Sequence, residues 1–173
     1  MESMIEFVHQ RIKKHKYQNG IDFTMGNGHD TLFLSDYCHH VYSYDIQSLA
    51  LNNTKELVKR KKNITLFLKS HEYFDEDVRD FEVGIFNLGY LPGGNHECVT
   101  QYEITLKTIK KALEHLVKGG CLYVVVYIGH DQGKESTNLD AYFRTLDHKL
   151  YNVAKFEMMN KKNAPYVVIV EKR

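Results

Sequence analysis

The run CLYVVVYIG at residues 121–129 constrains the fold of this chain more than any other segment. Its residues are apolar without a break, and valine and isoleucine are frequent among them. A strand with one wet face alternates apolar and polar residues, so an unbroken run predicts a strand buried on both faces of a parallel sheet. The run is far shorter than the ~20 residues that a membrane-spanning helix needs. We therefore expect a central strand.

The segment before this strand predicts a helix over residues 101–117. Thr100 and Glu103 have the spacing of a capping box, and Gly119 with Gly120 is typical of a helix end. Apolar residues recur there at steps of four and three, as one face of a helix requires. These residues are Tyr102, Leu106, Ile109, Leu113 and Leu116.

Strands and helices are predicted to alternate along the chain. Helices are expected at residues 3–16, 31–38, 48–60, 101–117 and 138–147. Strands are expected at residues 20–24, 41–45, 64–68, 82–88 and 121–129, followed by two more within 149–159 and 165–173. Such alternation is typical of a doubly wound α/β sheet, and the last two strands predict an antiparallel hairpin. The length of 173 residues favours a single domain over residues 1–173.

Charge and cysteine usage exclude some classes of protein. The formal net charge is +1, so a nucleic-acid surface would have to come from local clusters, and three basic clusters exist at residues 11–16, 59–62 and 160–163. The three cysteines form no C-x-x-C pair, which argues against a zinc knuckle or a disulfide framework and fits a reducing compartment. The first residues have no signal-peptide layout. We expect a soluble, cytoplasmic protein with no membrane partner.

The loop MGNGHD at residues 25–30 follows the first predicted strand, where a doubly wound sheet usually binds its ligand. Gly26 and Gly28 let a ligand approach the backbone. A phosphate loop would need Gly-Lys-Ser/Thr, which is absent, and a dinucleotide loop would have glycine in place of Thr31. Asp45 ends the second predicted strand, where a carboxylate can accept both ribose hydroxyls of an adenosine. Together, the loop and Asp45 favour nucleoside binding over a plain turn.

Three strings resemble one protein family. DFTMGNG at residues 22–28 is similar to the first motif, D-x-G-x-G-x-G, of class I S-adenosylmethionine-dependent methyltransferases, with Thr24 where the first glycine normally stands. IDFTMGNGHDTLFLS, together with FNLGYLPGG at 86–94 and YIGHDQGKE at 127–135, is similar to a small bacterial methyltransferase family first labelled as rRNA methylases. The resemblance covers almost the entire chain. It implies a Rossmann-like seven-stranded sheet, mostly parallel, with a C-terminal antiparallel hairpin.

The resemblance also implies an activity, a cofactor and an RNA partner. The activity would be transfer of a methyl group from S-adenosyl-L-methionine to the amine of 5-aminomethyl-2-thiouridine at the tRNA wobble position, giving 5-methylaminomethyl-2-thiouridine. The anticodon loop of tRNA would be the partner, because its unstacked bases can stack on aromatic side chains. A homodimer would widen the basic surface of so small a chain.

Cofactor-binding residues are implied at the ends of the first three strands. Gly26, Asn27 and Gly28 would hold the methionine part and the ribose. Asp22 would bond to the backbone of the loop or, through water, to the amine of the cofactor. The other four implied residues are Asp45 at the ribose hydroxyls, Gln47 at the adenosine, and Ser70 and His71 at the adenine. For His71, a surface loop histidine is an equal alternative.

Asn87 and Tyr90 are the expected catalytic residues. Amino-methylating enzymes of this fold often carry N/D-P-P-Y/F at the end of the fourth strand, where the first side chain and the next carbonyl orient the target nitrogen. Here the string is Asn-Leu-Gly-Tyr, which departs from that pattern at its two middle positions. Asn87 and the Leu88 carbonyl would orient the amine, and Tyr90 would stack on its base. A glycine-rich turn that merely starts at Asn87 is the alternative.

Several further interpretations stay open. His96, His130 and Asp131 are candidate helpers in proton transfer. No metal site is expected, because the adjacent His39 and His40 point apart on any regular element. Methylation of rRNA or of a small amine is the first rival function. A nucleoside-binding or RNA-binding module without turnover is the second, and an NAD oxidoreductase is the third.

Overall fold

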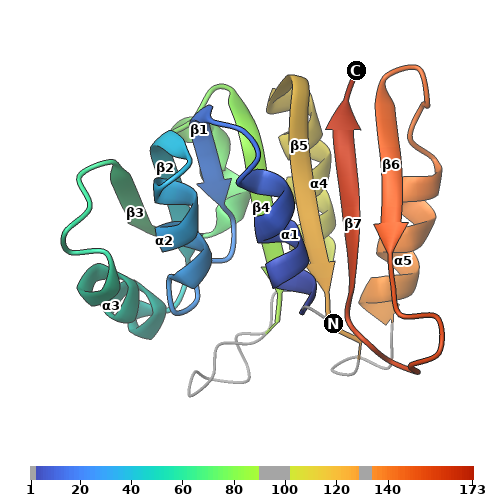
Figure 1. Ribbon diagram of the computed structural model, residues 1–173, viewed down its shortest axis with the longest axis horizontal. Coiled ribbons are helices and arrows are strands. Elements are labelled where there is room, and N and C mark those ends of the chain that lie inside the picture. The colour runs from blue at the N-terminus through green and yellow to red at the C-terminus, as the bar shows by residue number, and fades with distance from the viewer. Residues whose placement is uncertain (1–2, 90–101, 129–133) are drawn as a thin grey trace.

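The computed structural model describes residues 3–89, 102–128 and 134–173 (Figure 1). Within these ranges, the chain forms one seven-stranded sheet flanked by helices. Five residues with expected roles lie outside the described ranges: Tyr90, His96, Thr100, His130 and Asp131.

The elements follow one another in the alternation that the sequence predicted. The helices are α1 (Met4–Ile12), α2 (His29–Ser35), α3 (Ser48–Leu57), α4 (Tyr102–His115) and α5 (Lys134–Arg144), with a 3-10 helix, η1 (His71–Glu76). The strands are β1 (Tyr17–Asp22), β2 (Cys38–Asp45), β3 (Ile64–Leu68), β4 (Phe81–Leu88), β5 (Leu116–Val126), β6 (Tyr151–Phe156) and β7 (Tyr166–Lys172). Most ends differ from the predicted ends by a few residues.

The strands lie in the order β3-β2-β1-β4-β5-β7-β6. Strands β1 to β5 pair in parallel, and β7 inserts antiparallel between β5 and β6. This order confirms the expected mostly parallel sheet with a C-terminal antiparallel hairpin. The direction of strand addition reverses between β1 and β4, and sheets of this class bind ligands at the carboxyl ends of strands at such a point. The loop after β1 and the end of β4 therefore border the expected site.

The central strands of the sheet are buried on both faces, as the apolar run in β5 predicted. Helices α1, α2 and α3 cover one face, whereas α4, α5 and η1 cover the other (Figure 1). Leu122, Val124 and Val126 of β5 pack in the core on the α4 side. Tyr123 and Val125 pack in the second core, with α1. Successive side chains thus enter opposite layers, as the period of a strand requires.

The glycine pair that was expected to end the long helix lies within β5 instead. Helix α4 ends at His115, and the next residue, Leu116, already pairs with β4 and is only 1% exposed. The pairing of β4 with β5 then shifts in register, and Gly119 in this stretch has a φ of 77°. Glycine is common at such irregularities because it adopts a left-handed backbone without strain. Burial of Leu116 therefore ends the helix one turn before the glycines.

Candidate functional site

The loop between β1 and α2 turns sharply at the carboxyl end of β1. Gly26 and Gly28 have φ values of 51° and 83°, in the left-handed region that favours glycine. The Met25 N–H donates to the Tyr44 carbonyl of β2 at 2.9 Å, and the Gly28 N–H donates to the Met25 carbonyl at 2.8 Å. The loop is therefore fixed both to itself and to the end of β2.

Helix α3 supports this loop through Thr54. The Thr54 side chain is fully buried, and its hydroxyl donates to the Gly26 carbonyl at 3.2 Å. A Cβ atom at position 28 would lie 2.6 Å from Thr54 Oγ1 and 2.7 Å from Thr54 Cγ2. The side-chain amide of Asn53 also donates to Asn27 Oδ1, at 3.0 Å. Position 28 therefore requires glycine for its backbone conformation and for the space around it.

Asp45 ends β2 beside the loop. Its Oδ2 accepts from the Gly26 N–H at 3.1 Å, and its Oδ1 accepts from the Gln47 N–H at 2.9 Å. Burial raises the pKa of the Asp45 carboxyl, and the backbone N–H groups oppose that rise. Each carboxylate oxygen can accept a further hydrogen bond. The structure thus brings Asp45, Gly26 and Gln47 together at one edge of the sheet, with capacity left to bind ligand hydroxyls.

Exposed apolar side chains lie next to this carboxylate. Ile46 is 57% exposed, and Leu68, which pairs with Asp45 from the end of β3, is 51% exposed. An apolar surface beside a few fixed polar groups is typical of sites for small organic ligands. A purine could lie on the apolar surface while its ribose bonds to Asp45, so the residues present fit an adenosine.

Asp22 lies at the end of β1 and is fully buried. Its Oδ1 accepts from the Thr24 N–H at 3.1 Å, and its Oδ2 accepts from the Thr31 hydroxyl at 2.6 Å. Burial, followed by the nearby charge of Asp30, raises the pKa of Asp22. Asp22 therefore holds the glycine loop and α2 together, which is the architectural contact that we expected of it. Thr31, which replaces the third glycine of a dinucleotide loop, supplies one of the two donors.

His71 is buried, so the alternative of a surface loop histidine is wrong. The ring is 8% exposed, and its Nδ1 lies 2.9 Å from the Thr108 hydroxyl. That hydroxyl donates to the Ile104 carbonyl, so it can only accept from His71, and Nδ1 must carry the proton. Burial lowers the pKa of His71 to about 4. The imidazole is therefore neutral at pH 7 and serves packing beneath α4.

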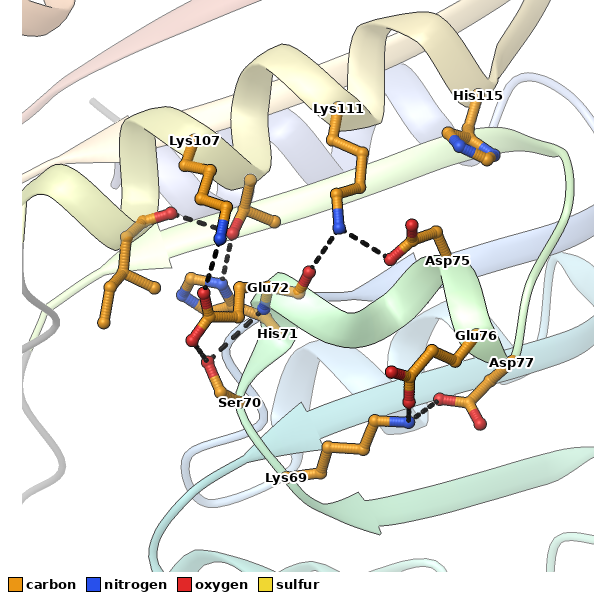
Figure 2. A network of polar contacts seen from close by, with 12 residues as sticks. Lys69, Ser70, His71, Glu72, Asp75, Glu76, Asp77, Lys107, Lys111 and His115 are labelled. Atoms are coloured by element: carbon orange, nitrogen blue, oxygen red, sulfur yellow. Dashed lines mark hydrogen bonds and ion pairs between the residues drawn. The ribbon is translucent and has the colours of Figure 1, made fainter.

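A network of ion pairs joins η1 to α4 around His71 (Figure 2). Lys107 of α4 reaches Glu72 at 3.1 Å, and Lys111 reaches Asp75 at 2.7 Å. Ser70, which precedes η1, caps it by accepting from the Glu72 N–H at 3.4 Å. Ser70 and His71 thus follow β3 as predicted, but the polar contacts of both side chains are to η1 and α4.

Asn87, near the end of β4, is held at both its backbone and its side chain. The Asn87 N–H donates to Thr24 Oγ1 at 2.7 Å, and Asn87 Nδ2 donates to Asp30 Oδ2 at 3.1 Å. The other oxygen of Asp30 lies 2.7 Å from His9 Nε2 in α1. Asn87 therefore lies beside the glycine loop, where the sequence predicted it. Thr24, at the position of the first motif glycine, links the loop to β4 by a bond that glycine could not make.

Sequence reasoning missed His9, Asp30 and Tyr127. Tyr127 follows β5, and its ring lies 3.6 Å from where a Cβ atom of Gly89 would be. Burial, and then the charge of Asp30, raises the pKa of Tyr127. The sequence did offer a signal for two of them. Asp30 is a polar residue in the first helical turn after the glycine loop, and Tyr127 is an aromatic residue at the end of a central strand. No signal in the sequence connected His9 to either residue.

The three basic clusters do not share one edge of the sheet. The clusters at 11–16 and 59–62 precede β1 and β3, so they lie at the amino ends of the parallel strands, opposite the loop. They meet there, because Lys16 donates to the Asp36 carbonyl and Lys61 pairs with the Asp36 carboxylate. The cluster at 160–163 joins β6 to β7, and Tyr166 pairs with Val126 at the end of β5. Of the three clusters, this third one alone lies at the same edge of the sheet as the candidate site.

Within the described part of the chain, no group of three or more His, Cys, Asp or Glu side chains could hold a metal ion. None of the helices in the same ranges is long and apolar enough to cross a membrane.

Comparisons with known proteins identify the family of this chain. A family model described as "Putative rRNA methylase" matches residues 41–172. A tRNA (mnm(5)s(2)U34)-methyltransferase of Arabidopsis thaliana, described as chloroplastic, is 36% identical over an alignment of 171 positions that covers 88% of this chain. The chain spans 62% of the length of that curated relative.

Solved structures match over essentially the whole chain. A protein from Streptococcus mutans, described as a "putative methyltransferase" in complex with SAH, superposes with a TM-score of 0.92 at 36% identity, covering 100% of this chain and 99% of that one. A protein from Clostridium thermocellum, described as a "putative rRNA-methylase", gives a TM-score of 0.94 at 32% identity, with the same coverage. Since the family model covers most of the sequence and these structures share the fold at over 30% identity, the chain belongs to the family described as "Putative rRNA methylase".

Proposed function

We propose that this chain is an S-adenosylmethionine-dependent methyltransferase whose acceptor is the amine of 5-aminomethyl-2-thiouridine at the tRNA wobble position. The product would be 5-methylaminomethyl-2-thiouridine. The observation that carries the proposal is the position of Asn87, whose amide is fixed next to the glycine loop by Asp30. An amide at that place suits an acceptor that is itself an N–H donor.

Two observations support S-adenosylmethionine as the cofactor. They are the fit of an adenosine to the residues beside the glycine loop and the ligand of a related structure. Asp45 and the exposed Ile46 and Leu68 suit the ribose and the base of an adenosine. The Streptococcus mutans relative was crystallised with SAH, the compound that S-adenosylmethionine becomes after methyl transfer. When bound, the cofactor supplies an electrophilic methyl group on a sulfonium, and the protein supplies position.

The residues of this chain would act by orientation. Asn87 Oδ1 would accept one N–H of the target amine and so direct its lone pair towards the methyl group. Attack by the neutral amine would form the N–C bond as the C–S bond breaks, the electron pair of that bond would stay on sulfur, and the new ammonium group would lose a proton to solvent. Tyr127 is the described aromatic residue beside Gly89, and we infer that its ring helps to hold the target base, a role first expected of Tyr90.

A tRNA acceptor is supported by the Arabidopsis relative, which is a tRNA methyltransferase by its description. Among the three basic clusters, only residues 160–163 lie at the same edge of the sheet as the candidate site, so we propose that these residues contact the anticodon arm. A second copy of the chain would add another such cluster. Sedimentation at several concentrations would contradict the homodimer if only monomer were found.

The test is methyl transfer to tRNA from cells that lack this gene. The purified protein, labelled S-adenosylmethionine and total tRNA are incubated, and the nucleosides are analysed by mass spectrometry after digestion. We expect one methyl group to be gained on 5-aminomethyl-2-thiouridine. Asp45→Ala should abolish the gain, and Asn87→Ala should reduce it sharply. A protein that binds the cofactor but leaves tRNA unlabelled would refute the proposed acceptor.

Ribosomal RNA is the second candidate acceptor, because the family description names rRNA. The same assay with ribosomal RNA from the same cells separates the two candidates. Label in ribosomal RNA without label in tRNA would favour the rRNA function. Transfer only to a free small amine would favour the remaining alternative, and cofactor binding without any transfer would point to a binding module.

A further inference from the structure

The side chain of Asn87 is oriented by a chain of contacts from two helices. Asp30, in the first turn of α2, accepts from Asn87 Nδ2 at 3.1 Å through Oδ2. Its Oδ1 lies 2.7 Å from His9 Nε2 in α1. The exposed fraction of the Asp30 side chain is 9%, and that of His9 is 22%. Both oxygens of a nearly buried carboxylate are therefore used, one on each neighbouring element.

The chemistry of Asp30 determines which way the amide of Asn87 faces. An ionised carboxylate is an acceptor only, so the nitrogen of the amide, and not its oxygen, must face it. Asn87 Oδ1 is then directed away from Asp30. Among the residues that the structure describes, no donor bonds to Asn87 Oδ1. An acceptor atom is thus held free at the end of β4, where the target amine would need one.

His9 fixes Asp30 in turn. Because a carboxylate cannot donate, His9 Nε2 must carry the proton that lies between the two groups. The His9 ring stacks on Phe33, with centroids 3.7 Å apart and planes 6° from parallel. Phe33 lies one turn after Asp30 in α2. The imidazole is therefore held between two residues of the same helix and can direct only one oxygen of Asp30.

We propose that Asp30 and His9 are positioning residues for methyl transfer, acting through Asn87. Asp30 fixes the orientation of the Asn87 amide, so that its oxygen faces the acceptor amine. His9 fixes the rotamer of Asp30. This inference rests on the proposed function, because it assigns the free oxygen of Asn87 to an amine acceptor. Neither residue touches the reacting atoms.

The first test is a double-mutant cycle on the single-turnover rate of methyl transfer to tRNA from cells that lack the gene. Asp30→Asn keeps the size of the side chain but lets either end of the amide face Asn87. We expect the rate to fall about 10- to 100-fold, the scale of loss that misplacement of a reacting group causes. The dissociation constant of S-adenosylmethionine, measured by calorimetry, should change less than about twofold, since Asp30 does not act on the cofactor.

The cycle separates positioning from a merely structural effect. In an Asn87→Ala background, Asp30→Asn should cause no further loss of rate, because its partner is already absent. If the fold loss of rate in the double variant equalled the product of the two single losses, the proposal would be overturned, since Asp30 would then act independently of Asn87. The matched control is Asp36→Asn, at the other end of α2, where Lys61 on the surface is the carboxylate's only partner among the described residues. This variant should keep the wild-type rate.

Two His9 variants test the second contact. His9→Gln can still present an N–H to Asp30, whereas His9→Leu cannot. We expect His9→Gln to keep most of the rate and His9→Leu to resemble Asp30→Asn. If both variants lost the same fraction of the methyl-transfer rate and had equal melting temperatures, His9 would not be a positioning residue.

A measurement without any acceptor keeps the inference apart from the proposed function. The side-chain amide of Asn87 gives a pair of NMR resonances, which are assigned by their loss in Asn87→Ala. Asp30→Asn should shift this pair, and Asp36→Asn should not. If wild-type protein methylates no tRNA, the proposed function fails and the NMR result alone decides the positioning. If Asp30→Asn left the chemical shifts of the Asn87 amide pair unchanged, the proposal would be refuted for any substrate.

Discussion

Gly28→Ala should destabilise the protein much more than Gly119→Ala, although both glycines have similar backbone conformations. Gly28 has a φ of 83° and Gly119 a φ of 77°, so alanine is strained at either position. Their surroundings differ. A Cβ atom at position 28 would lie 2.6 Å from Thr54 Oγ1, whereas a Cβ atom at position 119 would meet nothing within 4 Å. The second variant therefore measures the backbone strain alone.

The expected difference follows from the contact with Thr54. A left-handed backbone costs alanine about 1 to 2 kcal/mol. Alanine also reduces the conformational entropy of the unfolded chain, which stabilises the folded state by roughly 0.4 to 1 kcal/mol. The free energy of unfolding of Gly119→Ala should therefore be lower than that of the wild type by about 1 kcal/mol. At position 28, overpacking against Thr54 adds about 1 to 3 kcal/mol. Breaking the bond from Thr54 to the Gly26 carbonyl adds about 1 kcal/mol more. Gly28→Ala should thus exceed Gly119→Ala by about 3 kcal/mol.

The assay is urea unfolding of the wild type and both variants, with thermal melts alongside. For a chain of this length, a difference of about 3 kcal/mol corresponds to roughly 6 to 12 °C in melting temperature. Calorimetry with S-adenosylmethionine adds a functional measurement, because only Gly28 belongs to the loop that we assign to the cofactor. We expect weakened binding in Gly28→Ala and unchanged binding in Gly119→Ala. Equal stability losses in the two variants would refute the argument that Thr54 confines the loop.

Three further predictions concern the cofactor, the core histidine and the basic clusters. Asp45→Ala should weaken S-adenosylmethionine binding about 100-fold or more by calorimetry, because two hydrogen bonds to a charged group at about 1.5 to 3 kcal/mol each are lost; an unchanged affinity would contradict the ribose assignment. Burial lowers the pKa of His71 to about 4 from 6.5, so the folded state resists protonation and loses stability as pH falls through that window. In His71→Phe, the free energy of unfolding in urea should fall less between pH 7 and pH 5 than it does in the wild type. An equal fall in both proteins would contradict this assignment. Alanine at the lysines of 160–163 should weaken tRNA binding and its salt dependence in filter binding, whereas alanine at the lysines of 59–62 should not.

The mostly parallel character of the sheet was predictable, because a strand that is buried on both faces has an unbroken apolar sequence. The unbroken apolar run of β5 and the strand-turn-strand ending specified a parallel sheet with a final hairpin, and the structure has both. The end of α4 was less predictable. Gly119 and Gly120 resemble a helix terminator, but pairing of Leu116 with β4 competes with the last helical turn and prevails. That competition depends on a strand more than 30 residues earlier, which local patterns do not record.

The site was predictable only where it follows the strand ends. Gly26, Asp45 and Asn87 each close a strand or follow one, and parallel strands bring such positions to one edge. The same rule could have placed the basic clusters, since 59–62 precedes a strand and 160–163 lies inside the hairpin. His9 and Asp30 meet through the packing of α1 against α2, and no spacing in the sequence specifies that contact.

The departure from the family motif at position 24 has a physical reading. In the usual motif, glycine at this position leaves the loop after β1 and the end of β4 without a side chain between them. Here the Thr24 hydroxyl accepts from the Asn87 N–H, while the Thr24 N–H donates to Asp22. The loop that we assign to the cofactor and the strand that we assign to the acceptor are therefore joined through one residue. Asn87 is then held at its backbone by Thr24 and at its amide by Asp30, so the two sides of the proposed transfer share one rigid frame.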